Sequence, residues 1–97
     1  MKIELKKFGT TLLSRQAGRE ALSAFQPSLE NLPETEKIEV DFSGVITFSP
    51  SWGDEFLRPL QEKFDQKLIF TNTQNSSVKV TLELLEEVNK VKFNIES

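Results

Sequence analysis

The chain has 97 residues, enough for one ordinary domain with a single core and too few for two lobes that enclose a deep cleft. It contains neither cysteine nor histidine, which excludes disulfides, thiolate chemistry and serine–histidine or cysteine–histidine nucleophile pairs. The formal charge is −3, with 12 basic and 15 acidic residues spread along the chain, and this argues against binding to nucleic acid or to an anionic membrane.

Eight phenylalanines and one tryptophan provide large side chains for a core. No apolar run approaches the roughly 20 residues that a membrane-spanning helix needs, and residues 1–4 do not resemble the start of a secretory signal. We therefore expect one domain over residues 1–97, located in the cytoplasm.

The first elements are predicted as a strand followed by a helix. Polar and apolar residues alternate over 2–6, which is typical of a strand with one buried face. From Thr11 the apolar spacing changes to that of an amphipathic helix, which we expect to end before Pro27 because the residue before a proline is disfavoured in a helix. The predicted apolar stripe of this helix consists of Leu13, Ala17, Ala21, Leu22 and Phe25.

The middle of the chain is predicted to form a strand, a short loop and a second helix. Residues 37–42 alternate again, and Ser43-Gly44 interrupts them; we expect Val45, Ile46 and Phe48 to keep the loop near the core. The helix that follows has a stripe of Trp52, Phe56, Leu60 and Phe64. Pro59 lies within it and predicts a kink or a division.

The C-terminal third begins with the apolar run 68–70, predicted as a central strand buried on both faces. After a polar stretch over 71–77, a third helix is expected from apolar residues at helical spacing, namely Val78, Leu82, Leu85 and Val88. Residues 91–95 alternate, which favours either a last strand or an extension of the helix. The alternation of strands and helices predicts a single small α/β domain, with a mostly parallel or mixed sheet of about four strands and three helices.

Three segments resemble a known family. They read FGTTLLSR at 8–15, IEVDFSGV at 38–45 and SPSWGDEF at 49–56. Together they resemble the STAS-like domain family of unknown function, which is related in fold to the bacterial anti-sigma-factor antagonists.

The resemblance implies a function and a site. In the antagonists a central strand leads through an Asp-Ser-Ser-Gly loop into a helix that opens with a phosphorylated serine, and Ser51 falls on that serine, with Pro50 before it and Trp52 in place of the glycine. The implied function is a regulatory module that docks a protein through residues 43–56 and is switched by serine phosphorylation. The implied partner is a histidine-kinase-like ATPase or an anti-sigma-like regulator.

The candidate partner-binding residues are Ser49, Ser51, Trp52, Asp54 and Glu55, with Ser51 as the phosphorylation candidate. Structural roles are alternatives for several of them. Ser51 with Asp54 is close to a capping box, and Ser49 followed by Pro50 is a competing helix cap. Trp52 belongs to the apolar stripe and is equally compatible with the core and with an exposed binding anchor.

A rival function uses Asp41, Asp54 and Glu55 as a Mg²⁺-dependent carboxylate site or a receiver-like phosphoacceptor. Their ordinary roles are helix-end electrostatics and turn hydrogen bonds, and Arg15 is expected to pair with one of them. We expect no enzyme activity, no cofactor and no metal site. A third alternative is a structural role as a homodimer paired through the strand near Val91, so the expected state is a monomer or a weak homodimer.

Overall fold

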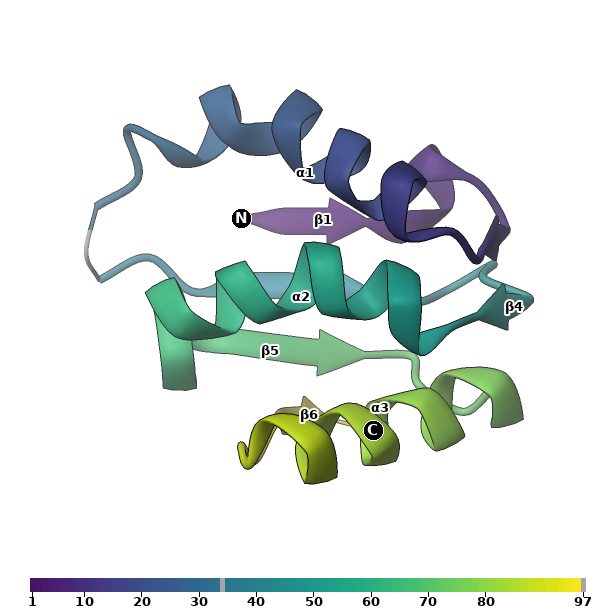
Figure 1. Cartoon of the computed structure of the whole chain (residues 1–97). Coiled ribbons are helices and arrows are strands. Elements are labelled where there is room, and N and C mark those ends of the chain that lie inside the picture. Colours follow the sequence, from purple (N-terminus) through teal and green to yellow (C-terminus); the bar gives the residue numbers. More distant parts are fainter. Residues whose placement is uncertain (34, 97) are drawn as a thin grey trace.

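Four parallel strands form the sheet of this computed structural model, which describes residues 1–33 and 35–96 (Figure 1). In spatial order they are β1 (Lys2–Glu4), β3 (Ile38–Asp41), β5 (Leu68–Thr71) and β6 (Asn94–Glu96). The spatial order equals the chain order, and right-handed crossovers between successive neighbours place every helix on the same side. The described residues accordingly form three helices on one face of the sheet (Figure 1).

The helices and the minor elements complete the α/β fold. The helices are α1 (Arg15–Leu29), α2 (Pro50–Phe64) and α3 (Ser76–Asn89), and short 3₁₀ segments occupy Leu5–Phe8 and Asp65–Lys67. A second, two-stranded parallel sheet pairs β2 (Thr11–Leu12) with β4 (Thr47–Phe48). The predicted fold class is confirmed, and the small sheet is an addition that the alternation pattern did not indicate. Within the described residues, none of the helices is both long and apolar enough to cross a membrane.

The pleat of the sheet separates a buried face from an open one. Val40 and Phe70 are fully buried under the helices, and they are paired in register. The neighbouring pair, Glu39 and Ile69, lies on the opposite face and is only partly buried. The strand at 68–70 is central, as predicted, but the prediction that both its faces are buried is wrong because all the helices lie on one side.

Aromatic rings fill the centre of the core, between the helices and the sheet. The rings of Trp52 and Phe56 stack with centroids 4.8 Å apart, and Phe8 lies 5.3 Å from Phe56. On the other side Phe48 meets Trp52 at 6.1 Å and Phe42 at 5.3 Å. The 3₁₀ segment that contains Phe8 therefore closes the core above the first turns of α2.

Two glycines allow the helices to approach α2 closely. A Cβ at Gly18 of α1 would lie 2.6 Å from the backbone oxygen of Trp52, closer than real Cβ contacts occur. A Cβ at Gly53 would lie 2.8 Å from the Leu85 side chain of α3. A side chain at position 18 would meet the backbone of α2, so Gly18 sets the distance between α1 and α2. A side chain at position 53 would instead displace the ends of the Leu85 and Phe48 side chains.

The first helix differs from its prediction at both ends. It begins at Arg15 rather than Thr11, because the Ser14 hydroxyl accepts a hydrogen bond from the Ala17 backbone N–H at 3.0 Å and residues 11–12 are used in the small sheet. It continues through Pro27, an exposed position near its end where one lost backbone bond costs little. Leu13 and Ala17 are exposed, so they do not belong to the buried stripe.

Two predictions in the rest of the chain also change, and one is confirmed in part. Pro59 does not divide α2, which is continuous over Pro50–Phe64. Ile46 is 63% exposed and does not hold its loop to the core, whereas Val45 and Phe48 are buried as predicted. A last strand exists, as one of the two alternatives for 91–95 predicted, but it covers Asn94–Glu96, where β6 pairs with β5, and residues 91–93 lie outside it.

Candidate functional site

The start of α2 is held by Ser49 rather than Ser51. The Ser49 hydroxyl oxygen accepts a hydrogen bond from the backbone N–H of Trp52 at 3.4 Å, and the same hydroxyl donates to the backbone oxygen of Leu13 at 2.5 Å. Pro50 follows in the first helical turn, where its missing N–H is not needed. Ser49 is thus the helix cap, and it also ties α2 to the segment before α1.

Ser51 makes no hydrogen bond through its side chain to any residue that the structure describes. It lies in the first turn of α2 and is partly buried. The capping-box interpretation of Ser51 with Asp54 is therefore wrong, because Ser49 performs that role. The Ser51 hydroxyl is left without a structural function in the described fold.

A groove between α2 and α3 contains Ser51. Pro50 and Ser51 form one wall and Leu84 and Val88 form the other, and Arg15 of α1 also lines it. We call this depression the α2–α3 groove. It brings the phosphorylation candidate next to apolar side chains from a distant part of the chain.

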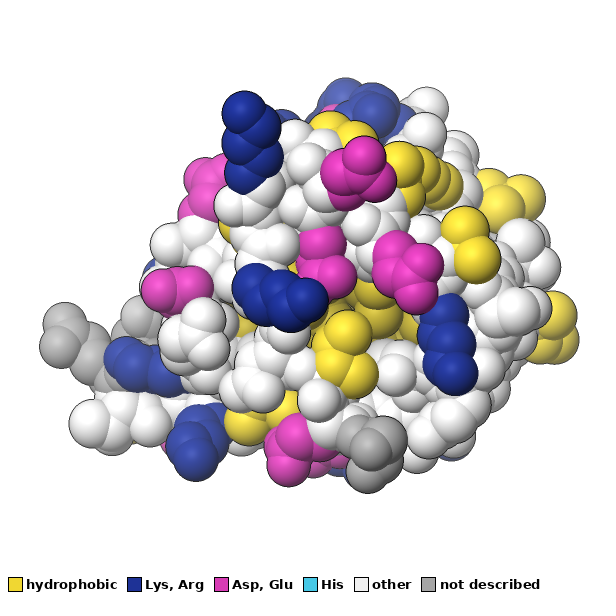
Figure 2. All heavy atoms as spheres, turned by 90° about the horizontal axis from the view of Figure 1, so that it is seen from below, with side chains coloured by type: hydrophobic (Ala, Val, Ile, Leu, Met, Phe, Trp, Pro, Cys, Tyr) yellow, Lys and Arg dark blue, Asp and Glu magenta, His cyan; other side chains and the backbone are white. Residues whose placement is uncertain are grey.

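The α3 wall of the groove belongs to an exposed apolar stripe. Val80, Leu84 and Val88 are four residues apart and are 64%, 41% and 65% exposed. We call these three residues the α3 stripe. Figure 2 shows apolar side chains at the surface on this side of the molecule, among acidic and basic ones. Val88 was predicted in the buried stripe, but Val78, Leu82 and Leu85 are the buried apolar positions of α3.

The α3 stripe was not predicted as part of the site. Its spacing of four residues was a usable signal, because it is a second apolar row beside the buried one on the same helix. Surface patches of this kind on a small domain mark sites of interaction more often than isolated apolar side chains do.

Asp54 and Glu55 take part in ion pairs between α1 and α2. Arg15 Nη1 lies 3.2 Å from Asp54 Oδ2 and 3.1 Å from Glu55 Oε1, so the predicted pairing of Arg15 is confirmed. Arg19 adds a contact of 3.4 Å to Glu55, and Arg58 one of 3.4 Å to Asp54. Hydrogen bonds from Arg15 and then Arg19 lower the pKa of Glu55, and bonds to Glu55 and Asp54 raise the pKa of Arg15.

Asp41 lies apart from these two acids, on the open face of the sheet. Its Oδ1 accepts hydrogen bonds from the Ser43 backbone N–H at 2.9 Å and from Asn72 Nδ2 at 2.7 Å, while Lys2 Nζ lies 3.6 Å from Oδ2. Burial alone would raise the pKa of Asp41, but the bonds from Asn72 and Ser43 and the charge of Lys2 outweigh it and lower the pKa.

The proposed carboxylate site does not assemble. Asp54 and Glu55 are on the helix side of the sheet, and Asp41 is on the other side, where it closes its own turn through Ser43. Within residues 1–33 and 35–96, no three acidic side chains gather in a way that could hold a metal ion. The rival interpretation of Asp41, Asp54 and Glu55 as a shared Mg²⁺ site is therefore wrong.

Trp52 lies in the core. It is 1% exposed and is packed against Phe8, Phe48 and Phe56. Its ring cannot contact a partner on the surface, so of the two interpretations of Trp52 the core one is confirmed. Its contribution to the candidate site is to fix the first turn of α2, on which Ser51 is carried.

Comparison with known proteins adds one finding. The model of the STAS-like domain of unknown function (DUF4325) matches residues 26–78, more than half of the chain. The match includes the segments 38–45 and 49–56 but not 8–15. No match was found among curated proteins or among solved structures.

Proposed function

Since the chain belongs to the STAS-like domain family of unknown function, we propose that it is a non-catalytic, cytoplasmic regulatory module that docks another protein through the α2–α3 groove. The observation that carries the proposal is the position of Ser51. Its hydroxyl has no hydrogen-bond partner in the described fold, and it lies in a groove with an exposed apolar wall.

Apolar burial supplies the affinity in this proposal. Covering the α3 stripe with a partner removes the exposed parts of three aliphatic side chains from water. Because they are only 41% to 65% exposed beforehand, each contributes roughly 1 kcal/mol. Ser51 and Pro50 then lie at the edge of the contact. The contact region extends the predicted segment 43–56 to include α3, while Trp52 acts only by supporting the fold.

The partner that we propose is a histidine-kinase-like ATPase domain that also phosphorylates Ser51. A phosphate on Ser51 would add close to two negative charges at the start of α2. It would lie one turn from Asp54 on the same wall of the groove and compete with Asp54 for Arg15 and Arg58, which line the groove as well. The added charge beside an apolar contact disfavours docking, so phosphorylation releases the partner.

The test is affinity capture followed by identification of the bound protein by mass spectrometry. Wild-type protein is compared with Ser51→Asp, Ser51→Ala and Leu84→Asp. We expect a histidine-kinase-like ATPase to be retained by wild type and by Ser51→Ala, and to be lost by Ser51→Asp and Leu84→Asp, because both of the latter place a charge in the groove. Incubating the captured pair with ATP is expected to add one phosphate to Ser51 in wild type and none in Ser51→Ala.

A matched control separates the groove from general surface effects. Ile95 is 43% exposed on β6 and lies away from the groove, so Ile95→Asp introduces the same charge at a similarly exposed apolar position. It is expected to retain the partner, with folding of all variants checked by circular dichroism. Capture that is unchanged in both Ser51→Asp and Leu84→Asp would rule out the groove as the docking site.

A further inference from the structure

The α2–α3 groove carries more positive than negative charge. Its lining includes the guanidinium groups of Arg15 and Arg58 and, as the one carboxylate among the described residues, that of Asp54. The two arginine side chains are 49% and 51% exposed, whereas that of Asp54 is only 21% exposed. The groove therefore presents mainly cations to the solvent, although the whole chain is acidic with a net charge of −3.

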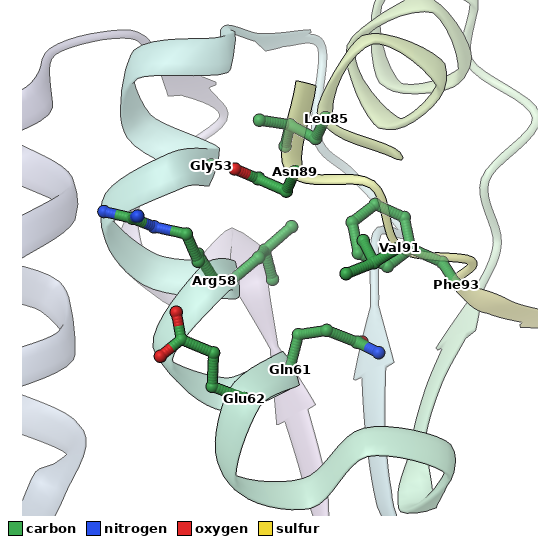
Figure 3. Close-up of a pocket in the computed structure, with 9 residues that line it drawn as sticks. Gly53, Arg58, Gln61, Glu62, Leu85, Asn89, Val91 and Phe93 are labelled. Atoms are coloured by element: carbon green, nitrogen blue, oxygen red, sulfur yellow. The ribbon is translucent and has the colours of Figure 1, made fainter. Parts of the chain in front are cut away.

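Both arginines keep unused hydrogen-bond donors. Arg15 contacts Asp54 and Glu55 through Nη1 alone. Arg58 contacts Asp54 through Nε alone, and Figure 3 shows its guanidinium extending away from Val91. A guanidinium has five N–H donors, and the remaining ones make no bond to any residue that the structure describes. They are available to donate to a carboxylate of a bound partner.

The walls of the groove favour a helix as the docked segment. One wall is the start of α2, and the other is the outer face of α3. Between the ends of a helix, the backbone N–H and C=O groups are bonded to each other, so these walls offer no open strand edge. A segment buried against them must satisfy its own backbone groups, which a helix does and an extended segment does not.

The α3 stripe has the length and the neighbours that such a helix needs. Its three residues span about 12 Å along the axis of α3, at about 1.5 Å per residue. A helix laid along the stripe covers it with apolar residues three or four positions apart. Because Arg15 and Arg58 line the same groove, residues beside that apolar row meet the arginines, where an acidic residue is attracted and a basic one is repelled.

From these observations, and resting on the proposed docking in the groove, we infer that the docked segment is an amphipathic helix. Its apolar row covers the α3 stripe, and an Asp or Glu beside that row pairs with Arg15 and Arg58. A phosphate on Ser51 would accept hydrogen bonds from the same arginine donors and would displace the carboxylate of the partner.

The test is an NMR titration of ¹⁵N-labelled protein with two synthetic peptides of about 15 residues, each held helical by a side-chain staple. Both have the same row of leucines at helical spacing, and the positions flanking that row are glutamate in one peptide and lysine in the other. We expect saturable shifts at the amides of Ser51, Leu84 and Val88 with the glutamate peptide.

The glutamate peptide is expected to have a dissociation constant about tenfold lower than the lysine peptide, the effect of two exposed ion pairs of about threefold each. The net charge of −3 by itself favours the lysine peptide, so this order of affinity reports on the groove. The preference is expected to shrink when NaCl is raised from about 0.05 M to about 0.5 M, because salt screens exposed charges.

Two variants and a control connect the preference to the arginines. Arg58→Gln is expected to reduce the preference about threefold, and Asp54 keeps its contact with Arg15 in this variant. Ser51→Asp is expected to reduce it as well, because it adds a carboxylate beside the same arginines. Lys79→Gln removes a positive charge from an exposed position of α3 outside the groove, and it is expected to leave the preference unchanged.

The wild-type comparison of the two peptides is sufficient if a variant does not fold. Equal affinity, or tighter binding of the lysine peptide, would overturn the acidic helix and leave docking in the groove intact. Shifts that do not saturate with either peptide, or that lie only outside the groove, would overturn the helix itself. Docking in the groove fails by a different result, which is capture of the partner that is unchanged in Ser51→Asp and Leu84→Asp.

Discussion

Asp41 shows how a single buried carboxylate can be structural although its position after a central strand suggests chemistry. It is 5% exposed, yet three groups stabilise its ionised form: the Ser43 N–H, the Asn72 amide and Lys2. Its pKa is lowered by these partners in spite of burial. The folded state therefore holds the proton of Asp41 less tightly than the unfolded chain does, and ionised Asp41 stabilises the fold.

The pH dependence of Asp41 follows from that sign. Its stabilisation is fully present above the ordinary aspartate pKa of about 3.9 and is lost as the pH falls through the lower folded-state value. Asp41→Asn is expected to lower the free energy of unfolding by about 1 kcal/mol at pH 7, and the difference from wild type is expected to shrink as the pH falls below about 4.

Urea unfolding of both proteins at pH 7 and at pH 3 measures this difference. Glu83→Gln, which removes an exposed carboxylate from α3, is the control and is expected to track wild type at both pH values. A difference between Asp41→Asn and wild type that stays constant with pH would contradict the role assigned to the ionised carboxylate.

Among the elements, the start of α2 is decisive for the candidate functional site. It carries two serines two residues apart: Ser49, which has a structural role, and Ser51, the candidate for regulation. Ser49 caps the helix and bonds to Leu13, whereas the Ser51 side chain has no described bond. The two serines therefore differ in role although the sequence allows either to cap.

This difference gives a paired prediction. Ser49→Ala is expected to lower the free energy of unfolding by about 1 kcal/mol, the usual effect of removing an N-cap side chain, and Ser51→Ala is expected to change it by less than about 0.5 kcal/mol. Urea unfolding monitored by circular dichroism compares them, each variant serving as the control for the other. A larger loss in Ser51→Ala would return the capping role to Ser51.

In the molecule as a whole, one core joins all the main elements. Buried side chains from the sheet, from the 3₁₀ segment after β1 and from all three helices form a single cluster. Trp52, the one tryptophan of the chain, lies inside it. Tryptophan fluorescence therefore reports on the same structure as the helix signal in circular dichroism.

We expect a single cooperative unfolding transition. Urea midpoints from Trp52 fluorescence and from far-ultraviolet circular dichroism are expected to coincide, because helices that share one core cannot unfold separately from it. Fluorescence that changes at a lower urea concentration than the helix signal would instead show that the packing around Trp52 unfolds before the helices.

Short-range patterns in the sequence are enough to predict the architecture and the family. The order of strands and helices, the central position of 68–70 and the resemblance of 38–56 all follow from patterns within short windows, because side-chain period reports directly on helix and strand. The absence of histidine and cysteine likewise excludes imidazole and thiolate chemistry by composition alone.

The membership of the candidate site, in contrast, depends on tertiary packing. Ser49 rather than Ser51 caps α2 partly because its hydroxyl reaches Leu13, which is 36 residues away in the sequence. Asp41 is separated from Asp54 by the sheet, and the α3 stripe is exposed because all the helices lie on one face and no further element covers it among the described residues. These outcomes depend on which distant segments come into contact. Packing and chain topology decide those contacts, and the periodicity of side chains within a short window carries no information about them.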